Sequence, residues 1–183
     1  MGSTRLGILA GSAFLDGIDL PGATLRTVAT PHGDVAVHDA DDFVLIRRHG
    51  EAGYCPPHRI PHHAHVLALE ALGIRHAAGL ASTGALHAAI VPGDIVIPDD
   101  YMSQHPPPTF AGDEYMHIVP GFDAGVRALL QAAAAAAAQG ARFTGSSIRG
   151  SGVYVQTHGP RFETAAEVRM LARDSYIVGM TAA

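Results

Sequence analysis

The stretch Gly152-Val-Tyr-Val-Gln-Thr-His-Gly-Pro-Arg-Phe-Glu-Thr-Ala-Ala-Glu-Val-Arg-Met170 decides the fold of this 183-residue chain. Its β-branched and aromatic start predicts a strand, which Gly159-Pro160 ends. Thr164 supplies an N-cap oxygen, and Glu167 completes a capping box, so a helix is expected to begin here. A strand that ends at a tight turn and opens a helix presents the turn's side chains to a crevice.

Phe162 and Glu163 lie in that turn. A flat apolar ring beside a carboxylate suits a heteroaromatic base, because the ring stacks on the base and the carboxylate accepts its hydrogen bonds. The alternative is a plain strand–helix connection that buries one phenylalanine and leaves one glutamate in water. The turn alone leaves both interpretations open.

Further strands and helices are expected on either side of this turn. Most of the apolar runs are continuous, which is typical of strands buried on both faces. Strands are predicted over residues 6–10, 43–46, 77–81, 95–97, 148–155 and 176–180, and helices over 62–72, 122–139 and 164–172. The alternation predicts a single α/β domain over residues 1–183, with a mixed, largely parallel central sheet flanked by helices.

Composition excludes several classes of protein. A formal net charge of -5, from 12 Lys+Arg against 17 Asp+Glu, argues against a nucleic-acid-binding surface. Hydrophobic content of 48% and charged content of 16% fit a soluble folded chain. The one cysteine, Cys55, excludes an internal disulfide and favours the cytoplasm. Neither a secretory segment nor a membrane span is expected, since the alanine run over 132–138 is too short.

Two strand ends carry groups suited to an anion. Gly11-Ser12 follows a predicted strand and can aim backbone N–H groups and a hydroxyl at an oxyanion, although most such dipeptides are plain turns. Arg48-His49 follows another strand, and its guanidinium is a rigid fork suited to phosphate oxygens. An exposed basic strand end is the alternative for this second pair.

A histidine cluster suggests a metal at first sight. It comprises His58, His62, His63 and His65. Spacing puts only some of these on one helix face, and neither a cysteine pair nor a carboxylate completes a site. No metal is therefore expected.

Five motifs in order resemble the trimeric purine nucleoside phosphorylases and their methylthioadenosine and methylthioinosine phosphorylase relatives. They are Gly7-Ile-Leu-Ala-Gly-Ser12, Arg48-His49-Gly50, Pro92-Gly-Asp-Ile-Val-Ile97, the Gly-Pro-Arg-Phe-Glu-Thr segment over residues 159–164, and Val178-Gly-Met-Thr181. The resemblance runs from near residue 5 to the end of the chain. It implies an enzyme that cleaves the N-glycosidic bond of a purine nucleoside with inorganic phosphate as co-substrate and without a cofactor.

The resemblance also implies roles for individual residues. Arg48 and His49 are the implied catalytic residues, and they are also implied phosphate ligands. The other implied phosphate ligands are Ser12, Thr181 and Ser82. Ser82 is the uncertain member of this set, because the chain reads Leu80-Ala81-Ser82 where the family has Thr-Thr-Ala.

For the nucleoside, the resemblance places Phe162 and Glu163 on the base and Met180 on the ribose. His117 matches a histidine that completes the neighbouring subunit's site, which implies a homotrimer; a loop histidine in water is the alternative. An ionised Glu163 only accepts hydrogen bonds, so it favours a 6-oxopurine, whose N1–H donates. A protonated glutamate would also serve adenine. The resemblance favours methylthioinosine or methylthioadenosine, with inosine or guanosine as the alternative.

The chain ends soon after Thr181, whereas family members continue with the group that acts at purine N7. We therefore expect a domain that is incomplete at its C-terminus. The rival hypothesis is a catalytically impaired remnant of the family that binds nucleoside, phosphate or another protein. Loss of a leaving-group acid costs on the order of 10²–10⁴ in rate.

Overall fold

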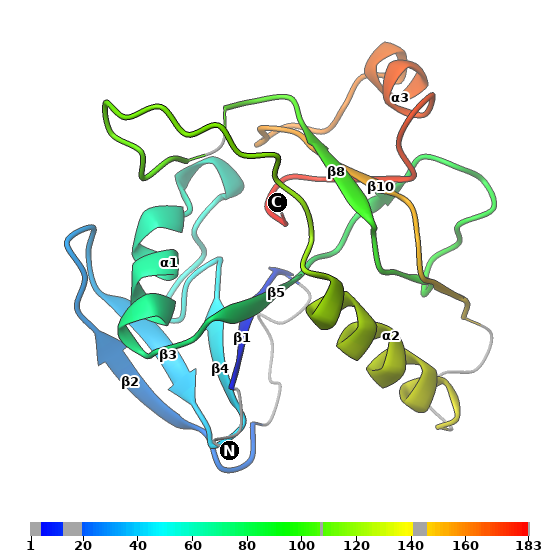
Figure 1. Cartoon of the computed structure of the whole chain (residues 1–183). Coiled ribbons are helices and arrows are strands. Elements are labelled where there is room, and N and C mark those ends of the chain that lie inside the picture. Colours follow the sequence, from blue (N-terminus) through cyan, green and yellow to red (C-terminus); the bar gives the residue numbers. More distant parts are fainter. Residues whose placement is uncertain (1–4, 13–19, 107, 141–145, 183) are drawn as a thin grey trace. The chain divides into compact units, whose positions relative to one another are not determined.

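The computed structural model describes residues 5–12, 20–106, 108–140 and 146–182 (Figure 1). These residues form two compact units. The first unit runs up to Ser82 and adds Pro106–Met116 and Ala182, and the second comprises Thr83–His105 and His117–Thr181. Within the described ranges, no helix combines the length and apolar character needed to cross a membrane.

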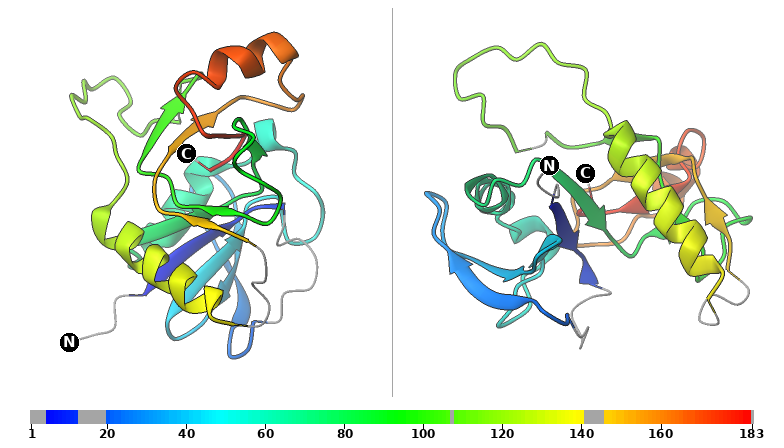
Figure 2. Two further views of the ribbon diagram at one scale, coloured as in Figure 1. Left: turned by 90° about the vertical axis from the view of Figure 1, so that its right-hand side faces the viewer. Right: turned by 60° about the horizontal axis from the view of Figure 1, so that its bottom comes forward.

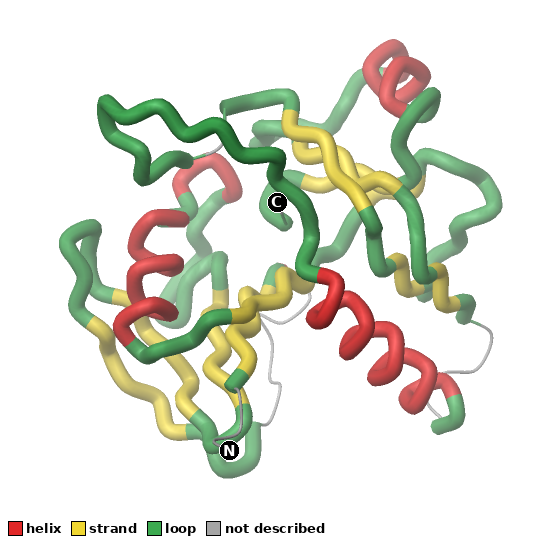
Figure 3. Tube along the Cα trace, in the orientation of Figure 1, coloured by secondary structure: helices red, strands yellow, loops and turns green. Residues whose placement is uncertain are grey.

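The first unit is built on a five-stranded sheet with the order β2-β3-β4-β1-β5 (Figure 3). Strand β1 runs parallel to both β4 and β5, whereas β2, β3 and β4 are joined in antiparallel pairs. The carboxyl ends of β1, β4 and β5 therefore meet at one edge of the sheet. The strands are β1 (Leu6–Ala10), β2 (Thr24–Val28), β3 (Val35–Asp39), β4 (Phe43–Arg47) and β5 (His76–Leu80).

Helix α1 (His62–Ala71) packs on this sheet, beside β3 in Figure 1. Ala64 and Ala68 lie one helical turn apart and face the sheet, and small side chains there let the helix approach closely. Together with Leu69 they form a core with valines and an isoleucine of β3 and β4, namely Val35, Val37, Val44 and Ile46. A short 3-10 turn, Pro57–Arg59, precedes the helix.

The second unit contains a four-stranded sheet with the order β6-β11-β10-β8. Strand β10 runs parallel to β11 and to β8, and Figure 2 shows β8 and β10 side by side. Strand β6 is antiparallel to β11, and β7 pairs with β9 in a separate parallel ladder. The strands are β6 (Gly84–Ala85), β7 (Ile95–Val96), β8 (Asp100–Ser103), β9 (Ile148–Arg149), β10 (Val153–Gln156) and β11 (Ile177–Gly179).

The two helices of the second unit have side-chain caps at their N-termini. In α2 (Ala124–Ala138), the carboxylate of Asp123 accepts a hydrogen bond from the backbone N–H of Val126 at 2.7 Å. In α3 (Ala165–Leu171), Thr164 and Glu167 form the capping box that the sequence predicts. Such caps satisfy backbone donors that have no partner inside the helix.

The mixed α/β architecture with mostly parallel strand pairs is confirmed, and all three predicted helices are present. One strand prediction is wrong, because residues 148–155 form parts of two strands and not one. The extended conformation is interrupted at Gly152, whose φ of 135° lies in the region that favours glycine. The sequence pattern does not predict the strands β2, β3, β6 and β8. Strand β2 lies at the sheet edge and is mostly exposed, so it lacks a continuous apolar run.

Candidate functional site

Arg48 lies at the edge where β1, β4 and β5 end, and its side chain is buried at 1% exposure. Its backbone N–H donates to the carbonyl of Ala10 at 2.9 Å. One terminal nitrogen of the guanidinium donates to the carbonyl of Leu80 at 2.8 Å, and the other donates to that of Leu9. Two neighbouring strands thus fix the plane of a buried cation, and their oxygens offset part of the cost of burying it.

Gly11 makes this arrangement possible. Its N–H donates to the carbonyl of Leu80 at 2.8 Å. A Cβ atom at this position would lie 2.7 Å from that carbonyl oxygen and 2.9 Å from a terminal nitrogen of Arg48, both too short for ordinary contact. The glycine is therefore required by close packing around the guanidinium.

Ser12 and Ser82 extend from the same edge of the first unit. Ser12 follows Gly11 directly, and Ser82 follows Leu80 by two residues, so the hydrogen bond between Gly11 and Leu80 holds the two segments together. Both serines are exposed. Of the predicted phosphate ligands, Ser12, Arg48, His49 and Ser82 thus belong to segments that meet at one sheet edge.

His49 is also buried, at 4% exposure. Its Nδ1 lies 2.8 Å from the carbonyl oxygen of Cys55, and the backbone N–H of Cys55 donates to the carbonyl of His49 at 2.6 Å. The ring of Tyr54 stacks on the imidazole, with centroids 5.4 Å apart and planes inclined by 9°. The imidazole is therefore held from its edge and from one face.

The first turn of α1 adds two histidines that sequence reasoning considered only as metal ligands. Burial, followed in effect by the charges of His62 and Arg48, lowers the pKa of His65 to about 4. Burial also lowers the pKa of His62, followed in effect by Arg48 and His63. Both imidazoles are consequently neutral at pH 7. The sequence gives no local signal for this, because only the tertiary fold brings α1 near Arg48.

The histidines of this region make other contacts. His63 bonds through Nε2 to the carbonyl of Thr109 at 3.0 Å, and its ring stacks on that of His32 at 5.0 Å between centroids. Across the described part of the chain, no group of three or more His, Cys, Asp or Glu side chains gathers as metal ligands would. The buried polar side chains at the carboxyl ends of β1 and β4 are Arg48 and His49.

In the second unit, the predicted site residues Met180 and Thr181 follow the carboxyl end of β11. The N–H of Thr157, just after β10, donates to the carbonyl of Gly179 at the end of β11 at 2.9 Å. Met180 is half-buried, and Thr181 is buried at 8% exposure. Met180 and Thr181 thus continue directly from the carboxyl end of a strand that is paired with β10.

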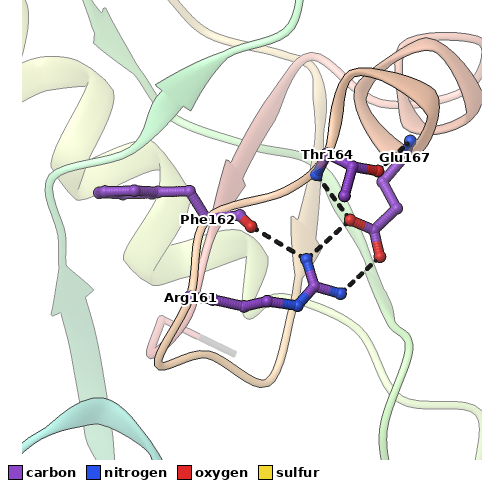
Figure 4. A network of polar contacts seen from close by, with 4 residues as sticks. All are labelled: Arg161, Phe162, Thr164 and Glu167. Atoms are coloured by element: carbon purple, nitrogen blue, oxygen red, sulfur yellow. Dashed lines mark hydrogen bonds and ion pairs between the residues drawn. The ribbon is translucent and has the colours of Figure 1, made fainter.

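The turn between β10 and α3 carries Phe162 and Glu163, and its conformation is fixed by an ion pair (Figure 4). The guanidinium of Arg161 donates to both carboxylate oxygens of Glu167, at 2.8 and 2.7 Å, and to the carbonyl of Phe162 at 2.9 Å. In Figure 4 the ring of Phe162 points away from this network, and it is 86% exposed. Glu163 is half-buried.

Hydrogen bonds from Arg161 lower the pKa of Glu167 to about 2, with the backbone N–H of Thr164 as the next cause. The same hydrogen bonds and charge raise the pKa of Arg161. The network is therefore fully charged at neutral pH, and it holds the backbone on both sides of Phe162 and Glu163. His117, the remaining predicted site residue, is exposed in the loop that precedes α2.

Known proteins with similar sequences are nucleoside phosphorylases. A protein of Archaeoglobus fulgidus described as a probable 6-oxopurine nucleoside phosphorylase is 35% identical over 181 residues, covering 97% of this chain and 72% of that protein. A probable S-methyl-5'-thioinosine phosphorylase of Methanopyrus kandleri is 35% identical over 189 residues, covering 97% of this chain and 70% of that protein.

Solved structures with a similar fold include a nucleoside phosphorylase as well. The methylthioadenosine phosphorylase of Schistosoma mansoni in complex with tubercidin superimposes with a TM-score of 0.81 at 27% identity, covering 97% of this chain and 72% of that one. The family described as the phosphorylase superfamily matches residues 6–183, which include every residue of the site described above. On this match and these identities, the chain belongs to the phosphorylase superfamily.

Proposed function

We propose that this protein cleaves the N-glycosidic bond of a purine nucleoside with inorganic phosphate. The products are the free purine base and ribose 1-phosphate, or 5-methylthioribose 1-phosphate from a methylthio nucleoside. The observation that carries the proposal is the buried guanidinium of Arg48, which the carbonyls of Leu9 and Leu80 fix at the carboxyl edge of three strands. The relatives named above, which include both 6-oxopurine nucleoside and thioinosine phosphorylases, support it.

The chemistry explains why an anion site is needed. A phosphate oxygen forms a bond to the anomeric carbon while the bond from that carbon to the purine nitrogen breaks, and the bonding electrons leave with the base, which takes up a proton. Arg48 and His49 are the proposed catalytic residues that hold phosphate under the sugar. A fixed cation at the place where charge develops stabilises the transition state without reorganisation. Ser12, Ser82 and Thr181 are proposed as further phosphate ligands.

The proposed base site lies in the turn before α3. Phe162 would stack on the purine, and Glu163 would accept a hydrogen bond from it, with Met180 against the ribose. An ionised carboxylate facing N1 of adenine would lose its partner, at a cost of about 1–3 kcal/mol. We therefore propose a 6-oxopurine nucleoside, inosine or methylthioinosine, as the preferred substrate, ahead of methylthioadenosine.

The wider proposals follow from the same family membership. The protein is proposed to act in the cytoplasm as a homotrimer, in which His117 reaches the site of a neighbouring subunit. It is proposed to need inorganic phosphate as co-substrate and no metal or organic cofactor. Purine nucleoside and phosphate are its proposed partners, rather than nucleic acid or a membrane.

A phosphorolysis assay tests the function. The protein is incubated with inosine, methylthioinosine and methylthioadenosine, each with and without phosphate, and free base and sugar phosphate are measured. We expect base release only with phosphate, and faster release from the two 6-oxopurine nucleosides. Release without phosphate would indicate a hydrolase instead. No release from any substrate, with binding still detected by calorimetry, would favour a nucleoside- or phosphate-binding role.

A further inference from the structure

The segment from Gly50 to Cys55 folds back onto His49. The backbone N–H of Cys55 donates to the carbonyl of His49 at 2.6 Å, and the carbonyl of Cys55 lies 2.8 Å from Nδ1 of His49. A carbonyl oxygen only accepts hydrogen bonds, so Nδ1 must carry a proton whether the ring is neutral or charged. The backbone of this segment thereby selects one tautomer of the neutral imidazole and leaves Nε2 as the nitrogen that can meet a ligand.

Tyr54 holds the same ring from its face. The two rings are nearly parallel, inclined by 9° with centroids 5.4 Å apart. His49 is 4% exposed, whereas Tyr54 is 63% exposed. The tyrosine therefore gains little from burial of its own surface, and its clearest contact is the imidazole. Stacking of this kind favours one orientation of the ring plane.

The segment is itself anchored. Gly50 has a φ of 95°, and a Cβ there would lie 2.2 Å from the carbonyl oxygen of Gly53, so only glycine permits this turn. Glu51 contacts Nε2 of His38 at 3.0 Å and pairs with Arg47 at 3.6 Å. Since His38 belongs to β3 and Arg47 to β4, two strands of the sheet hold the start of the segment.

We propose that the segment Gly50–Cys55 is a positioning device for His49, in which the Cys55 carbonyl keeps the proton on Nδ1 and Tyr54 fixes the ring plane. Nε2 is then the nitrogen that contacts phosphate. This inference rests on the proposed function, in which His49 is a phosphate ligand. Tyr54 acts through the histidine and does not touch phosphate, so it is a positioning residue.

The consequence for phosphate is specific. A neutral His49 with its proton on Nδ1 presents a lone pair at Nε2, which accepts a hydrogen bond from a protonated phosphate oxygen. A charged His49 instead donates from Nε2 to an ionised oxygen. Both contacts depend on the ring plane, so loss of the stacked tyrosine should weaken phosphate binding and leave nucleoside binding intact.

Three substitutions of Tyr54 distinguish the effect of its aromatic ring from the effect of its side-chain size. Tyr54→Phe keeps the stacked ring, Tyr54→Leu keeps apolar bulk without a ring, and Tyr54→Ala removes both. Leu25→Ala is the matched control, since it removes another large exposed side chain from the first unit. We expect the Leu and Ala variants to raise the KM for phosphate about 3- to 10-fold. The KM for the nucleoside, and both constants of the Phe variant and the control, should stay within about twofold.

Nitrogen-15 spectra of the imidazole give a readout that needs no turnover. In the wild-type protein the spectrum should show a proton on Nδ1 of His49, and added inorganic phosphate should shift the Nε2 signal. In Tyr54→Ala the same phosphate concentration should shift it less, with the Phe variant behaving as wild type. Failure of the proposed function would appear as no base release by the wild-type protein, and the spectra would still decide this inference.

Two results would overturn the inference. The first is a wild-type spectrum with the His49 proton on Nε2 and none on Nδ1. The second is a folded Tyr54→Ala protein whose KM for phosphate and whose His49 signals, with and without phosphate, match those of the wild type.

Discussion

The sheet edge around Arg48 and the turn before α3 each hold an arginine side chain in place, but by different kinds of contact. Arg48 is 1% exposed and is held by carbonyls of β1 and β5, which are far apart in sequence. Arg161 is exposed and pairs with Glu167, six residues away on the same turn and helix. The first cation is placed by the assembled sheet, whereas the second is placed by local chain geometry.

The two arrangements differ in what holds the arginine in place: the folded sheet in the first case and a short local segment in the second. A buried cation at a sheet edge stays in place as long as the sheet is folded, which suits a site that must stabilise charge. An exposed ion pair contributes little to global stability, because water screens it. It does fix the backbone around Phe162 and Glu163, which suits a turn whose side chains have to meet a substrate.

Substitution of Arg48 should have the largest effect. In Arg48→Lys, a single ammonium group replaces the fork that reaches Leu9 and Leu80, so we expect kcat/KM to fall about 100- to 1,000-fold. Steady-state kinetics with varied phosphate measures this, and a thermal melt confirms folding. Arg59→Lys, on the exposed 3-10 turn, is the control and should behave as wild type. A folded Arg48→Lys enzyme with near-normal kcat/KM would break the contrast between the two arginines.

Acid should weaken the first unit before the second. The pKa of His65 is about 4 in the folded protein, whereas an ordinary histidine has a pKa of 6.5. Between pH 4 and pH 6.5, His65 therefore binds more protons in the unfolded chain than in the folded one. The free energy of unfolding should therefore fall as pH drops through this window, by up to about 3 kcal/mol from His65. In the second unit, the pKa of Glu167 is lowered to about 2 from 4.5, so its contribution is lost only at lower pH.

Urea denaturation at pH 7 and pH 4.5, with hydrogen exchange corrected for intrinsic rates, measures this difference. His65→Leu should reduce the loss of stability over the window, whereas His58→Gln, which removes an exposed histidine, should leave it unchanged. Equal weakening of both units, or an unchanged acid response in His65→Leu, would contradict the assignment.

Glu163→Gln should have the smallest of these effects and the most selective one. The amide of glutamine can present a donor where the carboxylate accepts, so we expect the KM for inosine to rise about tenfold while that for methylthioadenosine changes little. Glu70→Gln, an exposed position on α1, is the control. Equal changes for the two nucleosides would defeat the assignment of Glu163 to the base and would leave the turn as a structural element.

Local sequence determined much of this protein. The capping box of α3, the strand over residues 6–10 and the helix after Pro61 follow from short-range patterns, because caps, turns and apolar periodicity act between neighbouring residues. The five short motifs also identified the family correctly. Those patterns missed four strands, β2, β3, β6 and β8, and the interruption at Gly152. The edge strand β2 is mostly exposed, so its burial pattern is set by the assembled sheet and not by a local apolar run.

Only the tertiary structure decided the surroundings of the anion site. Nothing near Arg48 in sequence indicates that its fork bonds to Leu9 and Leu80, or that the first turn of α1 lies close enough to keep His65 neutral. These contacts join strands and a helix that meet only when the sheet forms. The pKa of His65 depends on its burial and on the charge of Arg48, and both arise only when α1 packs against the strands of the sheet.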